Sequence, residues 1–175
     1  MKESRANRIL SLTLDYVVQP GISATPSEKS VESFQKAFAE EIPYFKEHPE
    51  YWGFYPIEND PLERQVFWLL RKGEGDRTVV LIHHSDVVDV SDYGIFEECA
   101  FSPLELEKQF LQEVDMLEPS FADDVKSGDF LFGRGTADMK GGGAIHLALL
   151  EEYCQEQNFQ GNVLILAVPD EENLS

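Results

Sequence analysis

Two uninterrupted apolar runs, each followed at once by histidine or acidic side chains, restrict most strongly what this chain can fold into. They are "VVLI" at 79–82, followed by "HHSD", and "VLILAV" at 163–168, followed by "PDEE". Runs without alternation predict strands buried on both faces, and a sheet covered by helices on both faces is a three-layer α/β fold, the αβα sandwich. Ligands bind such folds at the carboxyl ends of strands. We therefore predict a site at that rim of the sheet.

Two helices are predicted before the first strand. The apolar side chains over 4–18 are too dense for a fully exposed segment, which indicates a first helix. Thr25 and Glu28 have capping-box spacing, and Pro26 suits the first helical position, so a second helix is expected from Pro26 to Phe45. The segment "EHPEYWGFYPIENDPLE" that follows is predicted to be a loop whose aromatic side chains cover the core or line a cleft.

Strands are expected at 64–72 and 77–84, and the turn "GEGD" between them predicts a hairpin or a neighbouring pair. Residues 89–129 are acidic and irregular around one expected helix, "SPLELEKQFLQEVDML", and are predicted to be an insertion. A glycine-rich loop, "GRGTADMKGGG", is then followed by a predicted helix that runs to about residue 157. The last strand comes after this helix.

Charge and composition exclude several classes of function. The 14 Lys and Arg against 33 Asp and Glu give a net charge of −19, which disfavours nucleic acid and anionic membrane surfaces. No stretch approaches the roughly 20 apolar residues that span a bilayer, and the N-terminus does not resemble a secretory signal. Cys99 and Cys154 match no metal or disulfide pattern and are expected to be free thiols. We expect a cytoplasmic protein that binds neither membranes nor nucleic acid.

The end of the first apolar run carries the first candidate site residues. His84 and Asp86 are two positions apart, so in extended chain they point the same way, and Asp86 can accept a hydrogen bond from the ring nitrogen of His84 that does not bind metal. His83 points to the opposite face, where a hydrogen-bonded core histidine is the simpler interpretation. Alone, a His-x-Asp at a strand end is more often structural than catalytic.

Further acidic residues follow in two distant segments. Asp138 stands in the glycine loop, and Glu171 and Glu172 follow the last strand. Imidazole nitrogen and carboxylate oxygen together suit zinc, including pairs of ions that share a carboxylate. The coincidence of His-x-Asp, a glycine loop with aspartate, and a Glu-Glu pair predicts one metal site at the rim of the sheet.

Each of these residues also has a simpler interpretation. Asp138 could cap the helix that follows it, and Glu171 and Glu172 could form a solvated acidic turn. The glycines 141–143 could suggest phosphate binding, but the Gly-Lys-Ser/Thr ending of a P-loop is missing, and close packing of helix on sheet explains them better. His146, in the middle of a helix, is expected to pack.

Three motifs in this order, "HHSDVVDV", "LFGRGTADMKGGGAIHLALL" and "VPDEEN", resemble those of the di-zinc metallopeptidase and deacylase family of aminoacylase, acetylornithine deacetylase, succinyl-diaminopimelate desuccinylase and glutamate carboxypeptidases. The 33 residues from Asp138 to Glu171 match the family's spacing. The residues around the motifs are most similar to those of the arginine-utilization branch of this family.

The resemblance implies a role for each site residue. His84 would bind one zinc ion, Asp138 would bridge both ions and Glu172 would bind the second. Glu171 would be the general base and Asp86 would orient His84. It also implies a cis peptide after the bridging aspartate, and cobalt or manganese as substitutes for zinc.

The chain also departs from the family's pattern. The 54 positions from His84 to Asp138 exceed the family's usual spacing, which agrees with an insertion at 89–129. The remaining ligands, an aspartate and a histidine, and a lid domain that often forms a homodimer would lie after Ser175. We therefore expect residues 1–175 to be the N-terminal portion of a catalytic domain and to be inactive alone.

Two functions from different classes follow. The first is zinc-dependent hydrolysis of an amide or peptide bond in a small N-acyl amino acid or peptide, in arginine catabolism if the branch resemblance holds. The alternative is a non-catalytic relative that serves as a binding or scaffolding module. The intact Glu171 favours the enzyme, because a protein without hydrolysis has little physical reason to keep an uncoordinated acid beside the ligands.

Overall fold

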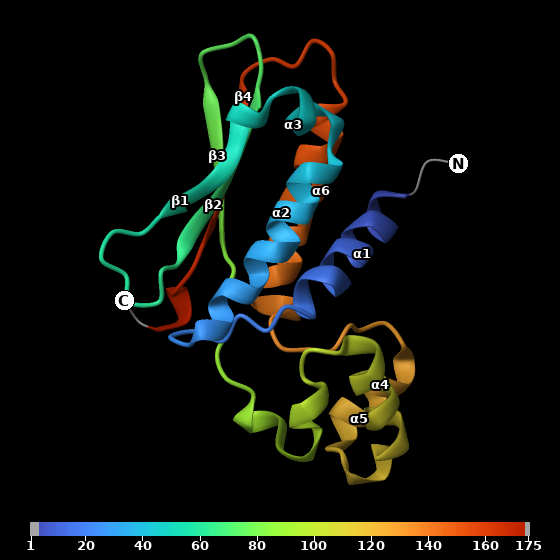
Figure 1. Cartoon of the computed structure of the whole chain (residues 1–175). Helices are drawn as coiled ribbons and strands as arrows, with labels where there is room; N and C mark the ends of the chain where they lie inside the picture. The colour runs from blue at the N-terminus through green and yellow to red at the C-terminus, as the bar shows by residue number, and fades with distance from the viewer. Residues whose placement is uncertain (1–3, 174–175) are drawn as a thin grey trace.

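The computed structural model describes residues 4–173, which form a four-stranded sheet with helices packed on it and a small helical unit at one end (Figure 1). The α-helices and strands, in chain order, are α1 (Arg5–Val17), α2 (Val31–Glu41), α3 (Pro43–Glu47), β1 (Trp52–Pro56), β2 (Gln65–Lys72), β3 (Thr78–His84), α4 (Pro103–Gln112), α5 (Pro119–Ser127), α6 (Gly141–Cys154) and β4 (Asn162–Val168). No described helix is long and apolar enough to cross a membrane.

The strand order of the sheet is β1-β2-β4-β3, with β3 parallel to β4 and the other pairs antiparallel. The expectation that β2 and β3 pair is wrong, because β4 lies between them. The link at 73–77 passes over the start of β4, where the side chain of Asn162 accepts from the N–H of Gly73 and donates to the carbonyl oxygen of Gly75. A Cβ on Gly73 would lie 2.2 Å from the carbonyl oxygen of Gly161, so this crossing requires glycine.

The hydrophobic core lies between the sheet and the helices α1, α2 and α6 on one of its faces (Figure 1). Phe67 and Leu69 of β2, Ile165 of β4 and Leu147 of α6 are all buried in it. Each such side chain contributes roughly 1.5–3 kcal/mol on burial. The α/β fold class is confirmed, and within residues 4–173 the sheet and this helical layer are two of the three predicted layers.

The segment predicted as an aromatic loop contains a strand. Residues 52–56 form β1, which pairs with β2 through the turn at 57–64. Trp52 and Phe54 pack against the core, whereas Tyr55 is 65% exposed. The prediction failed because pairing with β2 outweighs the weak local signal from proline and glycine.

The predicted second helix is broken. Residues 26–30 form a 3-10 turn, α2 ends at Glu41, and Pro43 begins the separate helix α3. The hydroxyl of Thr25 caps the turn by accepting from the N–H of Ser27, but the carboxylate of Glu28 does not complete a capping box. It accepts from the N–H of Ala24 and pairs with a distant arginine instead.

Residues 89–133 form a helical unit beside the end of the sheet (Figure 1). It contains two α-helices, α4 and α5, where only one was expected. Leu106, Phe110 and Val125 are buried in a hydrophobic cluster separate from the main core. Glu118 caps α5 and Gly128, at φ +69°, ends it, so the terminal signals of this missed helix are present in the sequence.

Candidate metal centre

The carboxyl ends of β3 and β4 meet at one edge of the sheet. The strands are parallel and in register, with His84 opposite Val168. His84 is 6% exposed and Asp86 is 1% exposed, so both ligand-type side chains lie inside the rim. This is the geometry that the two apolar runs predict.

Asp138 reaches the same edge from the irregular turn 136–140 before α6. Its side chain is 77% exposed, and the peptide bond from Asp138 to Met139 is cis, as the family resemblance implies. Lys140 is wholly buried, and its ammonium group donates to the carbonyl oxygens of Gln19 and Pro20, which ties this turn to the segment after α1.

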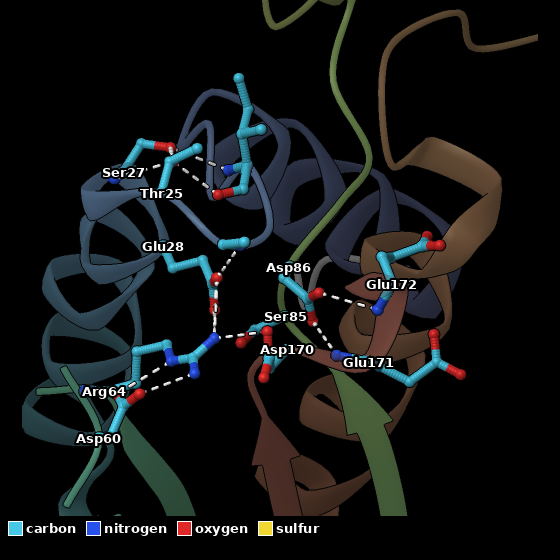
Figure 2. A network of polar contacts seen from close by, with 12 residues as sticks. Thr25, Ser27, Glu28, Asp60, Arg64, Ser85, Asp86, Asp170, Glu171 and Glu172 are labelled. Carbon is cyan, nitrogen blue, oxygen red and sulfur yellow. Dashed lines mark hydrogen bonds and ion pairs between the residues drawn. The ribbon is translucent and has the colours of Figure 1, made fainter. Parts of the chain in front are cut away.

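Glu171 and Glu172 lie in the turn that follows β4, and their backbone is held by Asp86. The N–H of Glu171 donates to Oδ1 of Asp86 at 3.2 Å, and the N–H of Glu172 donates to Oδ2 at 3.0 Å (Figure 2). Each oxygen of this buried carboxylate therefore accepts a hydrogen bond from the backbone of the acidic turn.

The structure brings His84, Asp138 and Glu172 together. One ligand atom from each residue lies within 4.8 Å of the other two, and Nε2 of His84 is 2.9 Å from Oδ1 of Asp138. Ligand atoms of one zinc ion lie about 2.0–2.2 Å from it, and paired ions lie about 3.5–4 Å apart. One imidazole and two carboxylates at this spacing fit one such ion or a closely spaced pair.

Glu171 lies beside this group rather than in it. Its Oε2 is 3.8 Å from Nε2 of His84, and its side chain is 59% exposed. This places a carboxylate next to the three ligand-type side chains with an open path to solvent.

Asp86 orients His84 in a different way from the one expected. Nδ1 of His84 is 2.9 Å from the backbone carbonyl oxygen of Asp86, whereas the nearest carboxylate oxygen of Asp86 is 3.6 Å away. The ring nitrogen therefore donates to the main chain, which leaves Nε2 facing the acids. The side chain of Asp86 holds the turn of Glu171 and Glu172 instead.

Electrostatics at the rim follow from this crowding of carboxylates. Burial lowers the pKa of His84, but hydrogen bonds to Asp86 and Asp138 and the charge of Asp86 outweigh it and raise the pKa to about 9. Burial, followed by repulsion from Asp138, raises the pKa of Glu172. The negative charge gathered here is what a bound cation would neutralise.

His83 and the glycines of α6 pack as expected. His83 is 1% exposed, and its Nδ1 is 3.3 Å from Nδ1 of His146. A Cβ on Gly143 would lie 2.7 Å from Cδ2 of His83, so the helix approaches the sheet as closely as only glycine permits. The core interpretation of His83 and the packing interpretation of His146 and the glycines are confirmed.

Sequence analysis did not predict a second polar network, which lies next to the turn of Glu171 and Glu172. Arg64 contacts the carboxylates of Glu28, Asp60 and Asp170. Only the position of Asp170, directly before Glu171, pointed to the site; the other members come from unrelated stretches of sequence.

Comparisons with known proteins found similar sequences and similar folds. Residues 109–175 match the family model described as Peptidase family M20/M25/M40. Two proteins of Bacillus subtilis (strain 168), YqjN and RocB, are each 36% identical over 95% and 96% of this chain. A succinyl-diaminopimelate desuccinylase of Shewanella pealeana is 25% identical over 98% of it.

Two solved structures share the fold. An M20 family metallo-carboxypeptidase of Sulfolobus solfataricus superposes with a TM-score of 0.63 over 93% of this chain and 31% of its own, at 15% identity. Human carnosine dipeptidase 1 superposes with a TM-score of 0.54 over 95% of this chain and 32% of its own, at 14% identity.

The chain spans about a third of these proteins, namely 30% of YqjN and of RocB and 36% of the desuccinylase. Over residues 109–175 the chain matches the peptidase family M20/M25/M40, and its fold is similar to that of an M20 family metallo-carboxypeptidase.

Proposed function

We propose that this chain supplies part of the metal centre of a zinc-dependent hydrolase that cleaves an amide or peptide bond in a small N-acyl amino acid or peptide. The observation that carries the proposal is the convergence of His84, Asp138 and Glu172 within 4.8 Å, from three segments far apart in sequence. A structural role explains each residue singly, but not their convergence.

The family resemblance implies a role for each residue, and the positions of the side chains support these roles. His84, Asp138 and Glu172 would hold the zinc, with one imidazole and two carboxylates as its ligands. Bound zinc would lower the pKa of a coordinated water and polarise the scissile carbonyl. Glu171 stands beside the ligands and carries a proton from the attacking water to the leaving amine nitrogen. Asp86 fixes both His84 and the backbone of the acidic turn.

The activity is proposed for the whole protein that contains this chain, because the chain spans about 30% of its Bacillus relatives. Arginine catabolism and a homodimer formed through a lid domain stay predictions based on the family resemblance alone. A non-catalytic binding module is the competing outcome of the test.

The test compares the full-length wild type with Glu171→Gln, which removes the proton carrier and leaves the ligands. Both should bind zinc with the same stoichiometry, whereas kcat for N-acyl amino acids or dipeptides should fall about 10²–10⁴-fold in the variant. Glu47→Gln, an exposed acid on α3, is the control and should leave kcat unchanged. Zinc binding without hydrolysis in wild type would favour the binding module, and an unchanged kcat in Glu171→Gln would refute the mechanism.

A further inference from the structure

Arg64, just before β2, joins carboxylates from three separate segments (Figure 2). It makes a bidentate pair with Asp60, from Nε to Oδ2 at 2.9 Å and from Nη2 to Oδ1 at 2.7 Å. Its Nη1 contacts Glu28 at 3.1 Å and Asp170 at 2.6 Å. One guanidinium therefore links the turn before α2, the turn between β1 and β2, and the turn after β4.

This network is sheltered from solvent. The side chains of Arg64, Asp60 and Glu28 are 12%, 3% and 1% exposed, and that of Asp170 is 21% exposed. Charge pairs at such depth are screened less than surface pairs, and the planar fork of arginine suits several carboxylates at fixed angles. Lysine, with a single ammonium group, could not reproduce this geometry.

The network ends at the residue next to the proposed base. Asp170 has φ +70° and directly precedes Glu171. On one side Arg64 holds the carboxylate of Asp170, and on the other Asp86 holds the N–H groups of Glu171 and Glu172. The backbone of the acidic turn is thus fixed between two anchors.

We propose that Arg64 and Asp170 form a clamp that positions Glu171 and Glu172 for metal binding and proton transfer. The clamp rests on the function proposed above and adds two positioning residues to it, neither of which touches metal or substrate. The attraction between Arg64 and Asp170 opposes the repulsion that drives three consecutive acids, Asp170 to Glu172, away from the other carboxylates of the rim. Without it, the turn stays attached to Asp86 but its side chains lose their fixed direction.

Two variants of the full-length, zinc-loaded enzyme test the clamp. Asp170→Asn removes the charge while keeping a residue that tolerates positive φ. Arg64→Lys keeps a positive charge but loses the fork. Loss of an anchor for a metal ligand typically weakens metal affinity about 10–100-fold, so each variant should raise the zinc dissociation constant in that range, measured by chelator competition. We also expect kcat to fall about 10–100-fold with KM changed less than about twofold, since misplacement affects the reacting groups rather than substrate binding.

Arg71→Lys is the matched control. Arg71 lies on β2, at the opposite end of the strand from Arg64, is 7% exposed and donates to the backbone carbonyl oxygens of Lys72, Tyr153 and Glu156. It should lower the unfolding midpoint in urea while leaving zinc affinity and kcat within about twofold of wild type.

The outcomes separate the clamp from the proposed function. If wild type binds no zinc or hydrolyses nothing, the function itself fails. If wild type is active and folded Asp170→Asn matches it in zinc affinity and kcat, the clamp is wrong and the network only stabilises the fold. If Arg64→Lys fails to fold, Asp170→Asn decides alone.

Discussion

At the scale of single residues, Asp86 shows how one buried carboxylate serves two neighbours at the site. Its carbonyl oxygen fixes the ring of His84, and its two carboxylate oxygens accept the N–H groups of Glu171 and Glu172. Burial alone would raise the pKa of Asp86, but the side chain of His84 and the N–H groups of Glu172 and Glu171 hold it below its ordinary value. The first and third motifs are therefore connected through this residue.

We predict that Asp86→Asn weakens both stability and metal binding. The amide would turn one N–H donor toward a backbone N–H, which should cost about 1–3 kcal/mol of unfolding free energy in urea denaturation, and zinc affinity should fall about tenfold. Asp89→Asn, an exposed change three residues on, should alter stability by less than about 0.5 kcal/mol. Equal losses in the two variants would contradict the anchoring role of Asp86.

At the scale of elements, α6 packs closely on β3. This contact sets the distance between the glycine-rich loop that carries Asp138 and the strand that carries His84. A Cβ on Gly143 would meet Cδ2 of His83 at 2.7 Å and Cε1 of Tyr16 at 3.1 Å, whereas one on Gly142 would meet the terminal methyl of Met139 at 3.2 Å. A flexible methionine end can move aside, but two buried rings cannot.

Gly143→Ala should therefore destabilise the protein by about 1–3 kcal/mol through overpacking. Gly142→Ala should be neutral or stabilising by up to about 1 kcal/mol, because alanine favours helix. Adding His83→Ala to Gly143→Ala should recover part of the loss. Urea denaturation of the full-length proteins measures all three, and equal stability of Gly143→Ala and Gly142→Ala would refute the close contact.

Local sequence patterns predicted the elements that carry the motifs, but not how the strands pair. The apolar runs at 79–82 and 163–168 and the helix after the glycine loop lie where they were expected. The insertion of β4 between β2 and β3 depends on long-range pairing and on contacts such as those of Asn162, which no local pattern reveals. The clamp of Arg64 and Asp170 was missed for the same reason, whereas motif spacing predicted the residues proposed as ligands.

At the scale of the whole molecule, β3 is one of the two outer strands of the described sheet and leads directly to the candidate site. The prediction that the run 79–82 is buried on both faces is wrong within residues 4–173, because Val79 is 58%, Val80 46% and Ile82 57% exposed. An open, apolar edge strand invites association with other strands. The chain spans about a third of the length of its relatives, so experiments on metal and activity are best made on the full-length protein.

The position of the bound metal tests the central claim most directly. Crystals of the zinc-loaded full-length protein, measured on both sides of the zinc absorption edge, should show anomalous density about 2.0–2.2 Å from Nε2 of His84 and from carboxylate oxygens of Asp138 and Glu172. Density at these three residues is the result predicted here. An active, zinc-loaded enzyme whose anomalous density lies away from all three would contradict the account.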